Sequence, residues 1–372
     1  MHLSEFSSHG FRNLSSDPVS FGAGVTLVTG ENAQGKTNLI EAVSLLCGQR
    51  SFRGATSADM ASDRDRFSIA GTIERATGPE RLRVSWSRQS GREFARGEKP
   101  SGFREISALA PAVFLAPEHR ELISGSPAVR RRFLDRLALG LKPAAGDDFA
   151  RYATALRERN ALLSRARLTR RMGSPGELEA WTEELALAGS AVRRQRRAAL
   201  EAWERAFAEL ARHAFRDGGK IRVEYASGGD SSEGLRESFE RLLPVERRRG
   251  HSLAGPHRDD LTWSRGGRPL AGQASTGEIT RIVALAKLAE WSAVAKVAEE
   301  PPLLAVDDFD AGLSEGWADE FFNALPGDAA VILTTATSPD RWARRAGAVL
   351  EVRAGVVSAR RVLRAVEATG AR

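Results

Sequence analysis

The sequence predicts an α/β protein in which one body is interrupted by a helical insert. Three observations support this prediction. Short β-branched runs dominate residues 1–116, long runs rich in alanine, leucine and arginine dominate 117–250, and strand–helix–strand character returns in 251–372. We therefore expect a first lobe built in two parts, from 1–116 and 251–372, and a helical second lobe built from 117–250.

The first predicted strand, "GVTLVT", leads into a glycine-rich stretch, "GENAQGKTNLIEA". Apolar residues then recur at helical spacing until Gly48. The stretch matches G-x-x-x-x-G-K-[ST], the phosphate-binding loop shared by kinases, GTPases, helicases and transporter-type ATPases. Lys36 is expected to reach the β- and γ-phosphates, and Thr37 to ligate Mg²⁺. The predicted nucleotide-binding residues are Gly30, Glu31, Asn32, Ala33, Gln34, Gly35, Lys36, Thr37 and Asn38.

Composition sets bounds on the class of protein. The 372 residues carry a net charge of +7, and residues 117–250 hold 27 Lys and Arg against 20 Asp and Glu. A local basic excess favours a nucleic-acid partner, although a general bias towards arginine could also produce it. No apolar run approaches the ~18 residues of a membrane span. A single cysteine, Cys47, and scattered histidines predict neither a disulfide nor a zinc site.

The middle segment reads as long helices. "AVRRRFLDRLALGL", "FARYATALRERNALLSRARLTRR" and a run from residue 177 to 215 have helical periodicity and helix-forming residues. A loop at Gly173, Ser174, Pro175 and Gly176 is expected to separate the last two. No strict heptad persists over enough turns to favour a coiled coil.

The second half of a nucleotide site follows much later in the chain. "LLAVDDFD" is a buried strand that ends in two acids, of which Asp307 is expected to hold Mg²⁺ and Asp308 to polarise the attacking water. The alternative is a strand with a solvated acidic end. Just upstream, "GQASTGEITRIVALAKLAEW" starts a helix at a Ser-x-Gly turn. Such a turn can simply begin a helix, but its position suggests that Ser275 and Gly277 grip a nucleotide held by a second copy of the chain.

This order of parts resembles the ABC-type ATPase head found in SMC proteins. More specific stretches resemble the RecF family of bacterial recombination and gap-repair ATPases, over about residues 1 to 340. They are "FRNL", "GENAQGKTNLIEA", "SFR", "GSPAVRRRFLD", "RERNALL", "GPHRDDL" and "LAKLAE". SMC heads also carry a very long coiled coil, for which this chain has no room.

The resemblance implies a two-lobe ABC-type ATPase head, a P-loop NTPase with the helical second lobe inserted, that uses ATP and Mg²⁺. Lys36 and Asp308 would be catalytic, and Thr37 and Asp307 would bind the metal. Arg12 would lie near the nucleotide. Thr334 or Thr335 would lie near the γ-phosphate, and of the two we expect Thr335. Ser275 and Gly277 would contact ATP across a dimer.

The resemblance also implies a function. Family members are ATP-dependent homodimers that bind double-stranded and gapped DNA in replication, repair and the SOS response. They help RecO and RecR to load RecA, and weak DNA-stimulated ATP hydrolysis releases them. A cytoplasmic, nucleoid-associated bacterial protein without membrane contact is therefore expected.

The chain departs from the family pattern in two places. Glu278 replaces the usual Gln after the Ser-x-Gly turn, and a carboxylate there should repel a γ-phosphate unless it points away or pairs with an arginine. After the paired acids the family usually has Ser-Glu-Leu-Asp, whereas this chain has "AGLS", with Ala311 and Ser314 at the ends.

Several alternatives therefore stay open. The chain could be an ABC-type head that acts on a protein partner, or a nucleotide-binding DNA clamp that does not hydrolyse ATP. The arginines at 130–132 could contact DNA or build a lobe interface. The runs "VRRQRR" and "ERRRG" are expected to be solvated faces rather than DNA contacts.

Overall fold

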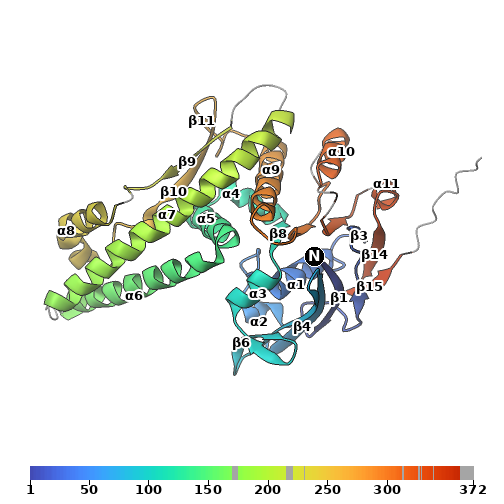
Figure 1. Cartoon of the computed structure of the whole chain (residues 1–372), viewed down its shortest axis with the longest axis horizontal. Coiled ribbons are helices and arrows are strands. Elements are labelled where there is room, and N and C mark those ends of the chain that lie inside the picture. The colour runs from blue at the N-terminus through green and yellow to red at the C-terminus, as the bar shows by residue number, and fades with distance from the viewer. Residues whose placement is uncertain are drawn as a thin grey trace, which may run out of the picture. The chain divides into compact units, whose positions relative to one another are not determined.

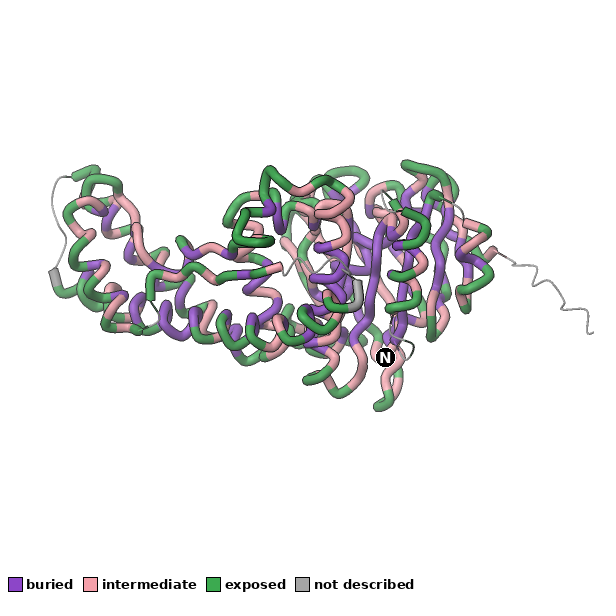
Figure 2. Tube along the Cα trace, turned by 90° about the horizontal axis from the view of Figure 1, so that it is seen from above, coloured by how far each residue is buried: buried purple, intermediate pink, exposed green. Residues whose placement is uncertain are grey.

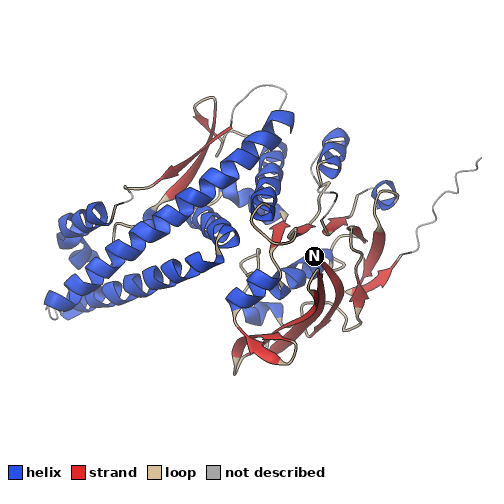
Figure 3. Ribbon diagram, in the orientation of Figure 1, coloured by secondary structure: helices blue, strands red, loops and turns tan. Residues whose placement is uncertain are grey.

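The computed structural model describes residues 1–169, 175–214, 221–229, 231–311, 314–325, 327, 329–337 and 339–360. The predicted loop residues Gly173 and Ser174 lie outside the described residues, as do the middle of "AGLS" and the last twelve residues of the predicted first lobe. Pro175 and Gly176 were also predicted as loop, but they form the start of a helix, α7 (Pro175–Ala214). Figures 1 and 3 show the arrangement of the helices and strands.

The chain divides into two compact units. One contains Met1–His119, Thr280–Trp291 and Ala295–Arg372, and the other contains Arg120–Ile279 and Ser292–Val294. The sequence placed the changes between lobes after residues 116 and 250; the units change after 119 and 279. The later second change arises because a small three-stranded sheet, made partly from residues beyond 250, pairs within the helical unit.

A six-stranded sheet carries the nucleotide motifs in the first unit. Its order is β15-β14-β3-β13-β12-β8, and β14, β3, β13, β12 and β8 run parallel to one another. The three strands expected from "VTLVT", "LLAV" and "VILTT" are buried along their length, apart from a half-buried Val25, as Figure 2 shows for the strands in purple. The strands are β3 (Val25–Thr29), β8 (Ala112–Leu115), β12 (Leu303–Val306), β13 (Val331–Thr335), β14 (Ala348–Arg353) and β15 (Val356–Ala359).

A second, antiparallel sheet of the first unit has the order β2-β1-β4-β5-β6-β7. Helix α1 (Lys36–Leu46) contributes to a core shared by both sheets, since Leu39, Ile40 and Val43 join strand residues of each. This helix is buried on nearly every side, and its buried residues include the polar Lys36, Glu41 and Ser44. The strands are β1 (His2–His9), β2 (Val19–Ser20), β4 (Arg66–Arg75), β5 (Gly78–Ser87), β6 (Gly91–Arg96) and β7 (Lys99–Ser101).

The short helices of the first unit are α2 (Ser57–Met60), α3 (Phe103–Leu109), α10 (Glu315–Asn323) and α11 (Pro339–Ala343). Helix α9 (Thr276–Ala295) belongs to both units, because its first turn counts with the helical unit and most of its length with the first. None of the helices formed by the described residues combines the length and the apolar character that crossing a bilayer requires.

The second unit consists mainly of helices. The predicted long helices are present as α5 (Pro127–Leu141), α6 (Gly146–Thr169) and α7 (Pro175–Ala214), beside α4 (Glu121–Ser124) and α8 (Ser232–Arg249). The sequence did not predict β9 (Ile221–Ala226), which pairs antiparallel with β10 (Asp260–Arg265), itself paired with β11 (Arg268–Pro269). Trp203 and Phe207 of α7 pack against Trp263 of β10 and fix this sheet on the helices.

Candidate nucleotide site

The glycine-rich stretch forms the turn between β3 and α1. Gly30 has a φ of 148°, and a Cβ there would lie 2.4 Å from the carbonyl oxygen of Val352, so only glycine fits. Gly35, with a φ of 122°, immediately precedes the helix. The ammonium of the buried Lys36 donates hydrogen bonds to the carbonyl oxygens of Gly30 (2.8 Å) and Glu31 (2.9 Å). Its charge is therefore held over the loop, as a phosphate-binding lysine requires.

Backbone and amide contacts hold the loop in place. The carbonyl oxygen of Gln34 accepts from the N–H of Gly355 (2.8 Å) and from Asn13 Nδ2 (3.2 Å), and Asn38 Nδ2 donates to Asn13 Oδ1 (2.7 Å). The other predicted loop residues, Glu31, Asn32 and Ala33, are exposed, and Ala33 has a φ of 63°. The exposed tip is thus presented to solvent on a fixed base, a state that suits binding of a charged ligand.

The two acids follow β12 and meet the loop helix. Asp307 is 3 % exposed, and its carboxylate accepts from the hydroxyl of Thr334 (2.6 Å) and from that of Thr37. Asp308 has a φ of 46°, a conformation that costs about 1–3 kcal/mol in a non-glycine residue and often marks functional sites. Its N–H donates to Thr334 Oγ1 (2.8 Å), which holds it there. The structure therefore brings Thr37, Asp307 and Asp308 together from segments far apart in the sequence.

Burial raises the pKa of Asp307 to about 6, an effect that the hydrogen bonds from Thr334 and Thr37 oppose. The neighbouring charges of Asp308 and Glu118 also raise it. A carboxylate that is costly to ionise in the protein alone gains most from a nearby divalent cation. The electrostatics of Asp307 thus fit the predicted role of metal ligand.

The two threonines at the end of β13 face different partners. Thr334 contacts the acid pair, whereas Thr335 Oγ1 lies 2.8 Å from Asp310 Oδ2, which also accepts from Trp342 Nε1 (3.0 Å). Successive side chains of a strand point to opposite faces, so only one of the two can serve the acids. Thr334 therefore lies beside Asp307 and Asp308, whereas Thr335, the residue expected from the sequence to lie near the γ-phosphate, contacts Asp310; its role stays a prediction.

Glu41 is a site residue that the sequence reasoning missed. It is fully buried on α1, four residues after Thr37, and forms a two-bond pair with Arg12 (3.0 and 3.2 Å). It also accepts from Ser51 Oγ (2.5 Å), while Arg53 donates to Asn38 Oδ1 (2.8 Å). "FRNL" and "SFR" therefore build the wall beside the loop helix. A carboxylate between the apolar residues Ile40 and Ala42 of this helix was the signal that could have revealed it.

Glu118 is a second residue that the sequence reasoning missed. It follows β8, the strand next to β12, so both strands end at the same edge of the sheet. Its Oε2 is buried and has no hydrogen-bond partner among the described residues, and Arg53 lies 3.6 Å from Oε1. The signal in the sequence was an apolar run, "AVFLA", ending in an acid as "LLAV" does.

The predicted Ser-x-Gly turn begins α9. Ser275 Oγ accepts from the N–H of Glu278 (3.3 Å) and the Ser275 carbonyl accepts from Ile279 (2.9 Å), so Ser275 caps the helix, and Gly277 lies in its first turn. Glu278, the departure from the family pattern, forms an ion pair with Arg265 of β10. This pairing meets one of the two conditions under which an acid is tolerable there.

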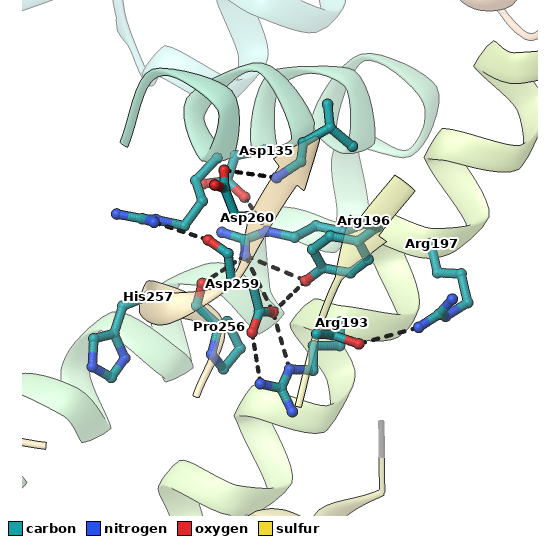
Figure 4. Close-up of polar contacts among 12 residues, drawn as sticks. Asp135, Arg193, Arg196, Arg197, Pro256, His257, Asp259 and Asp260 are labelled. Carbon is teal, nitrogen blue, oxygen red and sulfur yellow. Dashed lines mark hydrogen bonds and ion pairs between the residues drawn. The ribbon is translucent and has the colours of Figure 1, made fainter. Parts of the chain in front are cut away.

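The stretches specific to the family build a buried ion network inside the helical unit (Figure 4). Asp259 accepts two hydrogen bonds from Arg193 (3.0 and 2.6 Å) and one from Tyr225 (2.5 Å). Arg130 forms a two-bond pair with Asp260 (2.7 and 3.0 Å), and Arg131 donates to the Asp259 carbonyl (2.9 Å). Arg130 and Arg131 thus hold the helical unit together, an alternative that the sequence reasoning did not weigh.

The expectation that "VRRQRR" is a solvated face is wrong for two of its four arginines. Arg193 and Arg196 are 2 % and 4 % exposed, and Arg196 pairs with Asp135 (2.7 Å). Their spacing of three residues places both on the inner face of α7. Arg247, Arg248 and Arg249 of "ERRRG" are exposed, as expected, at the C-terminus of α8.

The residues present suit ATP and Mg²⁺. The loop offers backbone N–H groups, a helix N-terminus and the Lys36 cation for phosphates. Thr37 and Asp307 offer two oxygen ligands, which matches the preference of Mg²⁺ for few protein ligands completed by water and phosphate oxygens. Across the described ranges, no three His, Cys, Asp or Glu side chains cluster as a self-sufficient metal site. Any metal held here would therefore need ligands beyond the protein.

Comparisons with known proteins place the chain. Residues 1–131 match the family model of an AAA domain. The DNA replication and repair protein RecF of Cyanothece sp. (strain PCC 7425 / ATCC 29141) is 32% identical, over 96% of this chain and 98% of that protein. A solved structure of the recombination mediator protein RecF-ATP in the RecFOR pathway superimposes with a TM-score of 0.87 at 24% identity, covering 96% of this chain and 97% of that chain.

A Smc head domain from Pyrococcus furiosus, solved with an extended coiled coil and bound to part of ScpA, matches with a TM-score of 0.54 at 17% identity, over 96% of each chain. The fold is that of the ABC-type ATPase head, as the sequence predicted. Because the RecF protein of Cyanothece is 32% identical over 96% of this chain, the chain belongs to the RecF family.

Proposed function

We propose that this chain is an ATP-dependent DNA-binding protein of replication and recombinational repair, which dimerises on ATP and grips duplex DNA near single-strand gaps. The observation that carries the proposal is the hydrogen bond between Thr37 and Asp307, in a chain of the RecF family. It joins the phosphate loop to the acidic strand, which is the arrangement that ATP hydrolysis with Mg²⁺ needs.

Each residue has a defined task in this proposal. Lys36 and the loop N–H groups bind the β- and γ-phosphates, and Thr37 and Asp307 hold Mg²⁺. Bound Mg²⁺ supplies positive charge against the phosphate oxygens. Asp308, held by Thr334, orients and polarises the attacking water. Arg12, which is expected to lie near the nucleotide, forms a two-bond pair with Glu41 and so also positions α1.

The dimer follows from the chemistry of the phosphates. Ser275 and Gly277 at the start of α9 offer a hydroxyl and a helix N-terminus to the nucleotide of a second copy. Because only the dimer satisfies all γ-phosphate oxygens, ATP stabilises it and hydrolysis loosens it. We infer from family membership that RecO and RecR are partners and that the three help to load RecA in the bacterial cytoplasm; the RecFOR pathway named for a similar structure supports the choice of partners.

Two other functions compete with this one. An ABC-type head that acts on a protein partner would show no DNA-stimulated ATPase activity. A clamp that binds ATP without hydrolysing it would keep dimerisation and DNA binding. Membership of the RecF family favours DNA over a protein partner, and the strained Asp308 beside Thr334 favours hydrolysis.

The test is the oligomeric state of the chain with and without ATP–Mg²⁺, measured by sedimentation for wild type, Lys36→Ala and Ser275→Arg. The proposal expects an ATP-dependent dimer in the wild type. Lys36→Ala loses it because the nucleotide is not bound, and Ser275→Arg loses it because the turn is blocked. A wild type that stays monomeric with ATP, or a Ser275→Arg variant that still dimerises, contradicts the proposal.

A further inference from the structure

Glu278 poses a problem for any phosphate bound at the start of α9. Its backbone N–H donates to Ser275 Oγ, so its position is fixed one residue after Gly277. A carboxylate and a γ-phosphate repel each other strongly where water is excluded. An uncharged Gln, which the resemblance to the family leads us to expect at this place, would avoid the conflict.

The structure supplies an arginine at this point. Arg265, the last residue of β10, pairs with Glu278, whose side chain is 20% exposed. Isolated ion pairs at the surface contribute little to the stability of the fold. The position of Arg265 next to Glu278 is therefore more informative than the energy of their contact. It stands beside a turn of two glycines, Gly266 and Gly267, with φ values of 56° and 78°. Such a turn fixes a tight hairpin.

The hairpin and the turn before α9 form one folded segment. Trp263, two residues before Arg265, packs against Trp203 and Phe207, and its carbonyl accepts from the N–H of the buried Leu270 (2.9 Å). The Leu270 carbonyl in turn accepts from the N–H groups of Gln273 (3.2 Å) and Ala274 (3.0 Å). Anchored packing and short turns therefore set where Arg265 meets Glu278.

We infer that Arg265 is a positioning residue for the ATP-dependent dimer: it neutralises Glu278, so that the Ser275–Gly277 turn can accept the γ-phosphate of a nucleotide held by a second copy. The inference rests on the proposed function, since it concerns the same turn. It predicts that Arg265 and Glu278 act as a unit, in which an uncharged residue at 278 makes the arginine unnecessary.

The experiment compares wild type, Arg265→Ala, Glu278→Gln, the double variant Arg265→Ala/Glu278→Gln and the control Arg268→Ala on the same hairpin. Dimerisation with ATP–Mg²⁺ is measured by sedimentation, nucleotide binding to the monomer by a fluorescent ATP analogue, and folding by thermal unfolding. Arg265→Ala should weaken dimerisation by about tenfold or more, because a bare carboxylate then faces the phosphate. Its nucleotide binding and melting temperature should match the wild type.

The double variant should recover the dimer, and Glu278→Gln and Arg268→Ala should keep it. Arg265→Ala that dimerises normally overturns the inference. So does a double variant that fails to recover, because Arg265 would then act by another route. If the wild type itself does not dimerise with ATP, the proposed function fails, and the two failures are thus distinct.

Discussion

Asp307 is a carboxyl whose ionisation costs the folded chain. Its pKa of about 6 lies above the usual 3.8 because it is buried. Below about pH 4 the carboxyl is protonated in both the folded and the unfolded chain, so its stabilising contribution to the folded state is fully present. As the pH rises towards 6 the unfolded chain ionises first, so that contribution is lost.

We therefore predict that Asp307→Asn stabilises the protein at pH 8, by at most about 3 kcal/mol, and leaves stability nearly unchanged at pH 4. The Asn carbonyl can still accept from Thr334. Urea unfolding of both proteins at the two pH values measures the difference. A variant that is less stable than wild type at pH 8 would show that the ionised carboxylate of Asp307 does not destabilise the folded chain. The same variant should lose ATP-driven dimerisation, which links the cost to function.

Asp308 offers a separate test of hydrolysis. Asn tolerates positive φ well, so Asp308→Asn should keep the fold and the contact with Thr334. Without a carboxylate to polarise water, the rate of ATP cleavage should fall about 100-fold, while the ATP-dependent dimer persists. Single-turnover phosphate release measures the rate. An unchanged rate would favour the reading of a clamp that does not hydrolyse ATP.

At the scale of elements, the ion network around Asp259 ties α7 to the strands β9 and β10. Removing one partner of a buried pair leaves the other charged and desolvated. Asp259→Ala leaves the buried Arg193 without its ion-pair partner. We therefore predict a loss of about 3–5 kcal/mol in the stability of the helical unit. The matched control is Glu224→Ala on β9, whose pair with Arg222 is exposed and should cost less than about 1 kcal/mol.

Guanidinium unfolding followed by tryptophan fluorescence measures the loss, because Trp203 and Trp263 in the core of this unit are among the seven tryptophans of the chain. Equal losses in the two variants would mean that burial does not set the value of the Asp259 pair.

Local sequence patterns predicted the elements whose character is local. β3, β12 and β13 are short apolar runs, and α5, α6 and α7 have helical periodicity. β9 was not predicted because its pairing partner, β10, lies more than thirty residues further along the chain, beyond α8. The inner face of α7 escaped for a similar reason, since the acid that buries Arg193 belongs to another segment. Distant partners decide both, and periodicity does not reveal them.

The candidate site divides in the same way. Gly30, Lys36 and Thr37 lie in one contiguous motif whose chemistry is set by spacing alone. Glu41 and Glu118 become meaningful only when Arg53 and Asp307 approach them in the fold. The sequence does not show which face of the sheet each residue at the end of β13 points to. The partners of Thr334 and Thr335 could therefore be told apart only in the structure.

At the scale of the whole molecule, the nucleotide loop and the Ser275–Gly277 turn belong to different compact units of one chain. ATP bound between two copies would thus join a unit of one copy to the other unit of its partner. The net charge of +7 on each chain would attract the proposed dimer to DNA phosphates. DNA binding should therefore depend on ATP for its geometry and on salt for its strength.

The most direct test is the affinity of the chain for a gapped DNA duplex, with and without ATP–Mg²⁺, across a series of salt concentrations. For the wild type we predict that ATP raises the affinity by about tenfold or more, and that the logarithm of the affinity falls linearly with the logarithm of salt. Lys36→Ala should show the salt dependence without the response to ATP. Equal affinity of the wild type with and without ATP, or an ATP response that survives Lys36→Ala, would contradict the account.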